Sequence, residues 1–132
     1  MLLNLTDLSS EPLQQQIIRQ IRARILTGDL PAGKGLPSIR VMARDNRISV
    51  ITVQRAYEEL VREEVIHSRR GKGFFVSELP QKRKKDMAQQ RMYDNLEPLI
   101  LEALDDGLTN EDITSIVGDI LENTNNKNTT EE

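Results

Sequence analysis

The sequence contains no cysteine and no tryptophan, and its 132 residues include one histidine, two phenylalanines and two tyrosines. Without cysteine, disulfide bridges, thiolate metal sites and cysteine nucleophiles are excluded. The single histidine, His67, has no second histidine at metal-ligand spacing, so we predict no metal site, no cofactor and no enzyme activity. A core with so few aromatic side chains must be aliphatic, which favours a mainly α fold.

Long apolar runs are also absent. The sequence has no stretch of about 18 apolar residues and no secretory signal pattern. We therefore expect a soluble, cytoplasmic protein without a membrane partner. The length allows one ordinary domain, or a small domain with an appendage.

Charge is unevenly distributed along the chain. Residues 1–77 hold 12 Lys and Arg against 8 Asp and Glu, whereas residues 78–132 hold 6 against 13. The net charge of −3 hides this division. A basic part joined to an acidic part indicates one module that binds a polyanion and another with a different role.

The basic part predicts three helices followed by a hairpin. Apolar residues recur every four positions from residue 13 to residue 25, and Gly28 ends that segment. Ser38 and Ser49 are candidate caps for two further helices, the second of which has an apolar face from Val53 to Val61. Residues 65–69 and 74–77 predict two short strands around a turn rich in Gly and Lys.

Three helices and a hairpin, with a short connection between the second and third helices, are the elements of a winged helix-turn-helix. In that architecture the third helix enters the major groove of DNA and the second crosses the phosphate backbone. Gln54 can pair with adenine, and Val50 can touch a thymine methyl group. We predict that residues 1–77 form a DNA-binding domain with these contact residues: Ser38, Arg40, Arg44, Ser49, Val50, Thr52, Gln54, Arg55, Arg69, Arg70, Gly71 and Lys72.

The segment GDLPAGKGLPS, residues 28–38, also fits the first seven positions of the phosphate-binding pattern G-x-x-x-x-G-K-[ST]. However, Gly35 stands where a magnesium-binding hydroxyl is required, and Pro31 lacks an amide hydrogen. A predicted helix, and not a strand, precedes the loop. We therefore expect a connecting loop and not a nucleotide site.

The acidic part predicts a linker or the start of a linking helix over residues 78–90, two helices within residues 91–122, and a disordered tail over residues 123–132. Pro98 is expected to kink or divide the first of these helices. The two helices cannot bury their apolar stripes on each other alone, so the winged domain or a second subunit must cover them. We favour a homodimer with these interface residues: Met92, Leu96, Leu99, Ile100, Leu104, Ile113, Ile116, Val117 and Ile120.

Three strings of residues occur in a familiar order within residues 12–76: PLQQQIIRQIRARILTGDLPAGKGLPSIRVMA, ISVITVQRAYEELVREEVI and RRGKGFFV. Their motifs L-P-S-x-R, T-V-x-x-A-Y-x-x-L and R-x-G-x-G-x-F-V resemble those of the GntR family of bacterial transcription regulators. The resemblance implies DNA contacts from Arg40, from the third helix, and from Arg70 with Gly71. Val50 stands where many members have Arg or Pro, and Gly35 replaces a common charged residue.

The short second part most resembles that of the YtrA subfamily, whose members typically repress operons for membrane transporters. The resemblance thus implies that the protein represses an operon. As a dimer, it would bind an inverted repeat in double-stranded DNA. A small-molecule effector is a further partner, for which no residue cluster indicates a site. The alternative is a winged-helix module that binds another protein and has no salt-dependent affinity for DNA.

Overall fold

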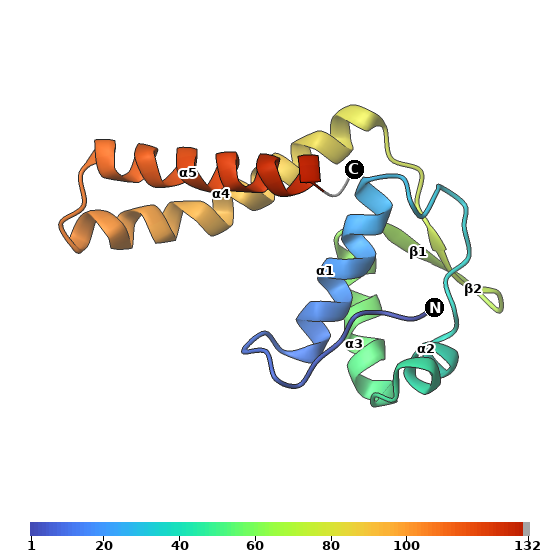
Figure 1. Cartoon of the computed structure of the whole chain (residues 1–132). Coiled ribbons are helices and arrows are strands. Elements are labelled where there is room, and N and C mark those ends of the chain that lie inside the picture. Colours follow the sequence, from blue (N-terminus) through green and yellow to red (C-terminus); the bar gives the residue numbers. More distant parts are fainter. Residues whose placement is uncertain (131–132) are drawn as a thin grey trace. The chain divides into compact units, whose positions relative to one another are not determined.

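The computed structural model describes the backbone of residues 1–130 and the side chains of residues 1–127. The elements are, in order, α1 (Leu13–Leu26), α2 (Ile39–Asn46), α3 (Val50–Arg62), β1 (Ile66–Arg69), β2 (Gly73–Val76), α4 (Gln81–Asp105) and α5 (Asn110–Thr130) (Figure 1). The chain divides into two compact units, with the boundary between Asp86 and Met87. The predicted mainly α fold with one small hairpin is confirmed.

Helices α1 and α3 pack on each other and form the core of the first unit (Figure 1). The isoleucines of α1 at four-residue spacing, Ile17, Ile21 and Ile25, are at most 1% exposed, as an amphipathic pattern predicts. The facing side of α3 is completely buried through Val53, Ala56, Tyr57 and Leu60. Burial of these side chains removes apolar surface from water and stabilises the packing of the two helices.

A buried ion pair joins α1 to the end of α3. Arg22 Nε and Nη2 each lie 2.6 Å from an oxygen of Glu63, and the Arg22 side chain is only 7% exposed. Two parallel hydrogen bonds of this kind compensate for the removal of the charges from water. The pair fixes the position of α1 along α3.

The hairpin completes the first unit. Strands β1 and β2 are antiparallel, with Ile66 opposite Val76 and Arg69 opposite Gly73. Ile66 and Val76 are each 1% exposed and close the core beneath the sheet. The observed strands, residues 66–69 and 73–76, differ from the predicted boundaries by one residue at three of the four ends.

In the second unit, α4 and α5 run side by side in opposite directions (Figure 1). Gly107 in the turn has a φ of +94°, a left-handed conformation that glycine adopts without strain. Thr109 caps α5, because its hydroxyl accepts from Asp112 N at 3.1 Å and Asp112 Oδ2 accepts from Thr109 N at 2.8 Å. The hydrogen bond from the backbone N–H of Thr109, with a smaller contribution from its side chain, holds the pKa of the Asp112 carboxyl below its ordinary value.

Helix α4 is continuous from Gln81 to Asp105 and contains Pro98, so Pro98 does not divide it. The proline removes one hydrogen bond, because it has no N–H. The flanking apolar residues Leu96 and Ile100 remain half-buried and line the same groove as residues of α5. Packing on both sides of the proline thus holds the helix together. Within the segment 78–90, for which we predicted a linker or the start of a helix, residues 81–90 form the first turns of α4.

Helix α5 extends to Thr130, whereas the sequence predicts its end at residue 122 and a disordered tail from residue 123. The prediction is wrong for residues 123–130. The Thr124 hydroxyl donates to the carbonyl oxygen of Ile120 at 2.8 Å, so this polar side chain finds a partner on the preceding helical turn. Residues 131 and 132 of the predicted tail lie outside the described residues. Within residues 1–130, no helix combines the length and the apolarity needed to cross a membrane.

Candidate nucleic-acid interface

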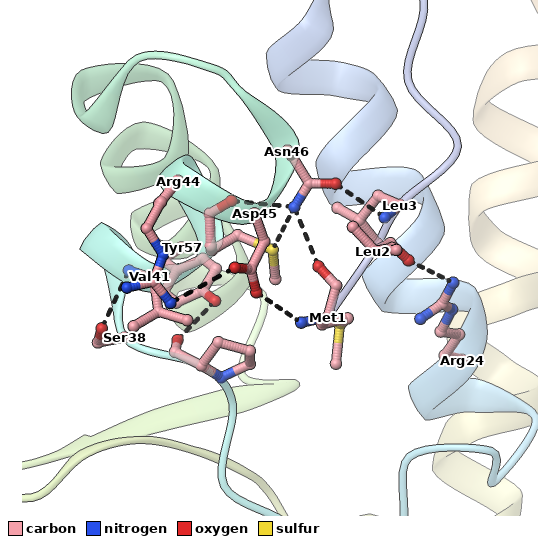
Figure 2. A network of polar contacts seen from close by, with 12 residues as sticks. Met1, Leu2, Leu3, Arg24, Ser38, Val41, Arg44, Asp45, Asn46 and Tyr57 are labelled. Carbon is pink, nitrogen blue, oxygen red and sulfur yellow. Dashed lines mark hydrogen bonds and ion pairs between the residues drawn. The ribbon is translucent and has the colours of Figure 1, made fainter.

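A serine caps the start of each helix of the helix-turn-helix, α2 and α3. Ser38 Oγ accepts from Val41 N at 3.2 Å (Figure 2), and Ser49 Oγ accepts from Thr52 N at 3.1 Å. Both caps are predicted from the sequence. Arg47 ends α2 in the left-handed conformation, with a φ of +54°. The chain therefore enters α3 after a short turn and leaves the first residues of α3 at the surface.

Tyr57 connects α3 to the start of α2 and to the hairpin. Its ring is completely buried and meets Phe74 of β2 edge-on, with ring centroids 5.1 Å apart. Its hydroxyl donates to the carbonyl oxygen of Pro37 at 2.8 Å, one residue before the cap of α2 (Figure 2). Burial raises the pKa of the Tyr57 phenol above its ordinary range, which keeps the phenol protonated as a donor. Tyr57 is thus a core residue.

The first turns of α3 present a mixed surface. Val50 is 46% exposed and Ile51 is 59% exposed, while Gln54 and Arg55 are exposed further along the helix. The Thr52 hydroxyl is half-buried beside the Ser49 hydroxyl. Large apolar side chains with this exposure can contact thymine methyl groups, and an exposed glutamine can pair with a base edge.

Two arginines of α2, Arg40 and Arg44, are exposed. The side chain of Arg44 is 75% exposed, and its Nη2 lies 3.6 Å from Asp45 Oδ1. The other oxygen of Asp45 binds the ammonium group of Met1 at 3.1 Å (Figure 2). Asp45 therefore divides its charge between two cations and holds Arg44 loosely, so the guanidinium group can reach a phosphate.

The segment formed by residues 1–11 is held against α1 and α2, an arrangement that the sequence analysis did not predict. Three side-chain amides each accept from a backbone N–H of this segment and donate to a backbone carbonyl, at 2.8–3.0 Å: Asn46, Gln20 and Gln16. Figure 2 shows Asn46 between α2 and the first residues of the chain. The available signal was the four-residue spacing of Gln16 and Gln20, which places both amides on one face of α1.

Phe75 organises the wing, which is the hairpin of β1 and β2. The guanidinium carbon of Arg69 lies 4.6 Å from the centroid of the Phe75 ring, in a cation–π contact. His67, the cross-strand neighbour of Phe75, stacks on the same ring. Gly35 forms a bridge with Phe75, and a Cβ atom at Gly35 would lie 3.4 Å from the ring. The glycine thus admits the ring, and His67 packs on Phe75 within the sheet.

The turn of the wing consists of Arg70, Gly71 and Lys72, all exposed. Gly71 has a φ of +75°, which a glycine adopts readily. The absence of a side chain there allows close approach of the backbone to a groove, while the two flanking cations can bind phosphates.

The backbone amides of the loop over residues 28–38 are used inside the protein. Gly33 N donates to Val76 O at 2.8 Å and Leu36 N donates to Phe74 O at 2.9 Å, while Val76 N donates to Lys34 O. The loop pairs with β2, as a short third strand would. These amides cannot also surround a nucleotide phosphate, which agrees with the connecting loop that we expected.

The predicted DNA-binding residues all lie in the first unit, on the capped start and exposed side of α2, the first turns of α3 and the wing. All of them are exposed except Thr52, which is half-buried. Exposed cations that accompany a helix with base-reading side chains are the features of a DNA-binding surface. Fold and surface together define a winged helix-turn-helix protein.

Comparisons with known proteins identify the family. Residues 13–76 match the family described as "Bacterial regulatory proteins, gntR family". The HTH-type transcriptional repressor YtrA of Bacillus subtilis (strain 168) is 35% identical over 95 residues, which cover 72% of this chain and 73% of YtrA. The chain belongs to the gntR family, and its relatives are DNA-binding transcriptional regulators, not enzymes.

Solved structures give the same result. A GntR family transcriptional regulator from Listeria monocytogenes matches with a TM-score of 0.70 and 31% identity, covering 87% of this chain and 98% of that one. AraR(DBD) in complex with operator ORX1 matches with a TM-score of 0.51 and 25% identity, covering 57% and 93%. For several other curated relatives, the match spans only 14% to 58% of their length.

Proposed function

We propose that this chain is a dimeric repressor that binds an inverted-repeat operator in double-stranded DNA, with α3 in the major groove and the wing on the adjacent groove. The observation that carries the proposal is the exposed start of α3, where Val50 and Gln54 share one compact unit with exposed arginines of α2 and the wing. Repression is supported by the likeness to YtrA, which is named as a repressor.

In this proposal the residues of α3 read bases and the surrounding cations position the protein. Gln54 pairs with adenine and Val50 contacts a thymine methyl group, while the hydroxyls of Ser49 and Thr52 bind bases or phosphates. The backbone of the DNA is contacted by the remaining predicted residues: Ser38, Arg40, Arg44, Arg55, Arg69, Arg70, Gly71 and Lys72.

The proposed dimer forms through the second unit. Helices α4 and α5 border an open groove of about 270 Å³ whose lining residues are all apolar. Leu99, Ile116 and Ile120 in this lining are 60%, 46% and 57% exposed. Such a patch marks an interaction surface, and a second copy of the chain supplies a matching one. The proposed interface residues are Met92, Leu96, Leu99, Ile100, Leu104, Ile113, Ile116, Val117 and Ile120.

The biological setting completes the proposal. We infer that the protein acts in the cytoplasm and regulates an operon. The subfamily resemblance makes a transporter operon the first candidate. A repressor needs a signal that releases it, so we include a small-molecule effector among its partners. The two DNA-binding units of a dimer would contact half-sites about 34 Å apart, or a multiple of that distance.

Fluorescence anisotropy on genomic fragments tests the DNA-binding part of the proposal. A protein with 6–10 phosphate contacts loses affinity by about 10³- to 10⁵-fold between 50 and 200 mM salt. Arg40→Ala should weaken binding to every sequence, whereas Gln54→Ala should relax the preference at one base pair by about 1–3 kcal/mol. Arg19→Ala is the matched control, because Arg19 is exposed on α1 and pairs with Glu11.

A salt-independent affinity would contradict phosphate-driven binding and favour the protein-binding module. An equal loss on specific and random DNA for Gln54→Ala would contradict base reading by this residue.

Light scattering tests the dimer. Ile116→Asp places a charge on the apolar groove and should yield a monomer with an intact winged unit. Ser115→Asp adds the same charge at a neighbouring exposed residue outside the apolar stripe, and should leave the dimer intact. A dimer that persists in Ile116→Asp would place the interface elsewhere.

A further inference from the structure

We propose that Glu58 determines the base preference of Gln54 by orienting its side-chain amide, so that Gln54 binds adenine in preference to guanine. This inference rests on the proposed function, in which Gln54 meets a base edge. Gln54 Nε2 donates to Glu58 Oε1 at 3.2 Å, and both side chains are exposed. The two residues are four positions apart on α3, so their side chains share one face of the helix.

Glu58 binds a different kind of side chain from the three other glutamates near the end of α3. Those three form ion pairs with arginines: Glu59 with Arg62, Glu63 with Arg22, and Glu64 with Arg83. Among the side chains described for residues 1–127, Glu58 instead accepts from the amide of Gln54. Its carboxylate therefore acts on a base-reading side chain and does not neutralise a cation.

The chemistry of the two groups fixes the orientation of the amide. An ionised carboxylate only accepts hydrogen bonds, so the part of the Gln54 amide that faces Glu58 must be the NH₂ group. One of its two N–H bonds is then committed. Gln54 keeps one N–H donor and one carbonyl acceptor for DNA.

This remaining pair of groups fits one purine better than the other. In the major groove, adenine presents the N7 acceptor beside the N6 amino donor, whereas guanine presents two acceptors, N7 and O6. One donor and one acceptor on Gln54 therefore match adenine. Against guanine, the carbonyl oxygen of Gln54 would face O6 with no hydrogen between them.

Loss of the carboxylate would remove this restriction. Without Glu58, both N–H bonds of Gln54 are available and the amide can turn over, so that it donates to either acceptor of guanine. The preference for adenine should therefore decrease, even though Glu58 itself does not touch the base. Glu58 is thus a positioning residue for the specificity of Gln54.

The test compares the full-length wild type with Glu58→Ala and Glu58→Gln on duplexes that carry A·T or G·C at one base pair. That base pair is the one whose preference changes in Gln54→Ala. We expect Glu58→Ala to lower the adenine-to-guanine affinity ratio about twofold, the factor that one exposed hydrogen bond at this spacing contributes. Glu58→Gln should lower the ratio as well, because a glutamine amide can donate to the Gln54 carbonyl as well as accept from its NH₂ group, and so no longer fixes the orientation of the Gln54 amide.

Glu59→Gln is the matched control for charge, because it removes a carboxylate one position away that pairs with Arg62. Both Glu58 variants and this control should raise the affinity for all duplexes, since each removes a negative charge near phosphates. An unchanged base ratio in Glu58→Ala would overturn the inference, and so would an equal decrease of the ratio in Glu59→Gln. An unchanged base preference in Gln54→Ala would instead overturn the proposed reading by Gln54.

Discussion

Replacement of Tyr57 by phenylalanine removes a single buried hydroxyl from the helix-turn-helix. This hydroxyl donates to the carbonyl oxygen of Pro37 at 2.8 Å, while the edge-on contact with Phe74 involves only the ring and is kept. A hydrogen-bond partner left unsatisfied in the interior costs about 1–3 kcal/mol. In a unit the size of the first, residues 1–86, each 1 kcal/mol lowers the Tm by about 4–8 °C.

Urea unfolding at pH 7 measures this loss, and alkaline pH adds a second check. Burial raises the pKa of Tyr57 in the folded state above its unfolded value of about 10. Its contribution to stability is therefore fully present below about pH 10 and is lost as the pH rises beyond that value. The wild type should lose stability above about pH 10 more steeply than Tyr57→Phe, so the difference between them should shrink.

Tyr93→Phe is the control, because it makes the same chemical change on a tyrosine that is 65% exposed. Its free energy of unfolding at pH 7 should equal that of the wild type. If Tyr57→Phe matched the wild type as well, or lost stability equally steeply in alkali, the role assigned to the hydroxyl would be refuted.

Three further substitutions test other contacts. Glu63→Ala leaves the buried Arg22 without its partner and should lower the free energy of unfolding by on the order of 3 kcal/mol in urea; a loss below about 1 kcal/mol, as for a surface pair, would contradict burial. Gly35→Lys should displace the Phe75 ring and weaken DNA binding several-fold in anisotropy while the Tm changes little; unchanged affinity would mean that the wing tolerates the shift. Thr109→Ala removes the cap of α5 and should cost about 1 kcal/mol in thermal unfolding followed by circular dichroism, with no change expected only if the helix end is already frayed.

The helices of the first unit were predictable because their signals are local. The four-residue spacing of isoleucines in α1 and the serines that cap α2 and α3 act through neighbours within one helical turn. The exposed residues of the candidate interface were predictable for the same reason. Once the apolar face of a helix is known from the sequence, the opposite face is expected to be exposed. The identity of Gln54 and Val50 as surface residues needed no tertiary information.

The remaining features depend on partners that are distant in sequence. Arg22 and Glu63 are 41 positions apart, and nothing in local spacing distinguishes a buried arginine from a solvated one. The same limit applies to Asn46, which binds backbone groups at the start of the chain. For Arg69, the DNA contact stays a prediction, and its contact with the Phe75 ring required the register of the hairpin.

The tail shows a different limit of prediction. A polar composition indicates that a segment cannot form a core of its own, and residues 123–130 indeed follow the last apolar residue of α5. The helix nevertheless continues through them, because elongation adds one backbone hydrogen bond for each residue fixed, once the helix has been nucleated. Composition therefore predicted the absence of helix in residues 123–130 incorrectly.

The first unit is basic and the second is acidic. This division of charge predicts opposite salt dependences for the proposed DNA binding and the proposed dimerisation. Residues 1–86 hold 16 Lys and Arg against 10 Asp and Glu, and residues 87–132 hold 2 against 11. Two acidic units brought together in a dimer repel each other, and salt screens that repulsion while leaving the apolar contact intact. The dimer should therefore tighten as salt rises from about 50 to about 500 mM, whereas DNA affinity should fall.

Sedimentation measures the first dependence without DNA, and anisotropy at protein concentrations that saturate the dimer measures the second. Tightening of the dimer would show that apolar burial outweighs the repulsion between the acidic units. A dimer that weakens with salt would contradict this reasoning, because it would require ion pairs between subunits that carry only two cations each in this unit.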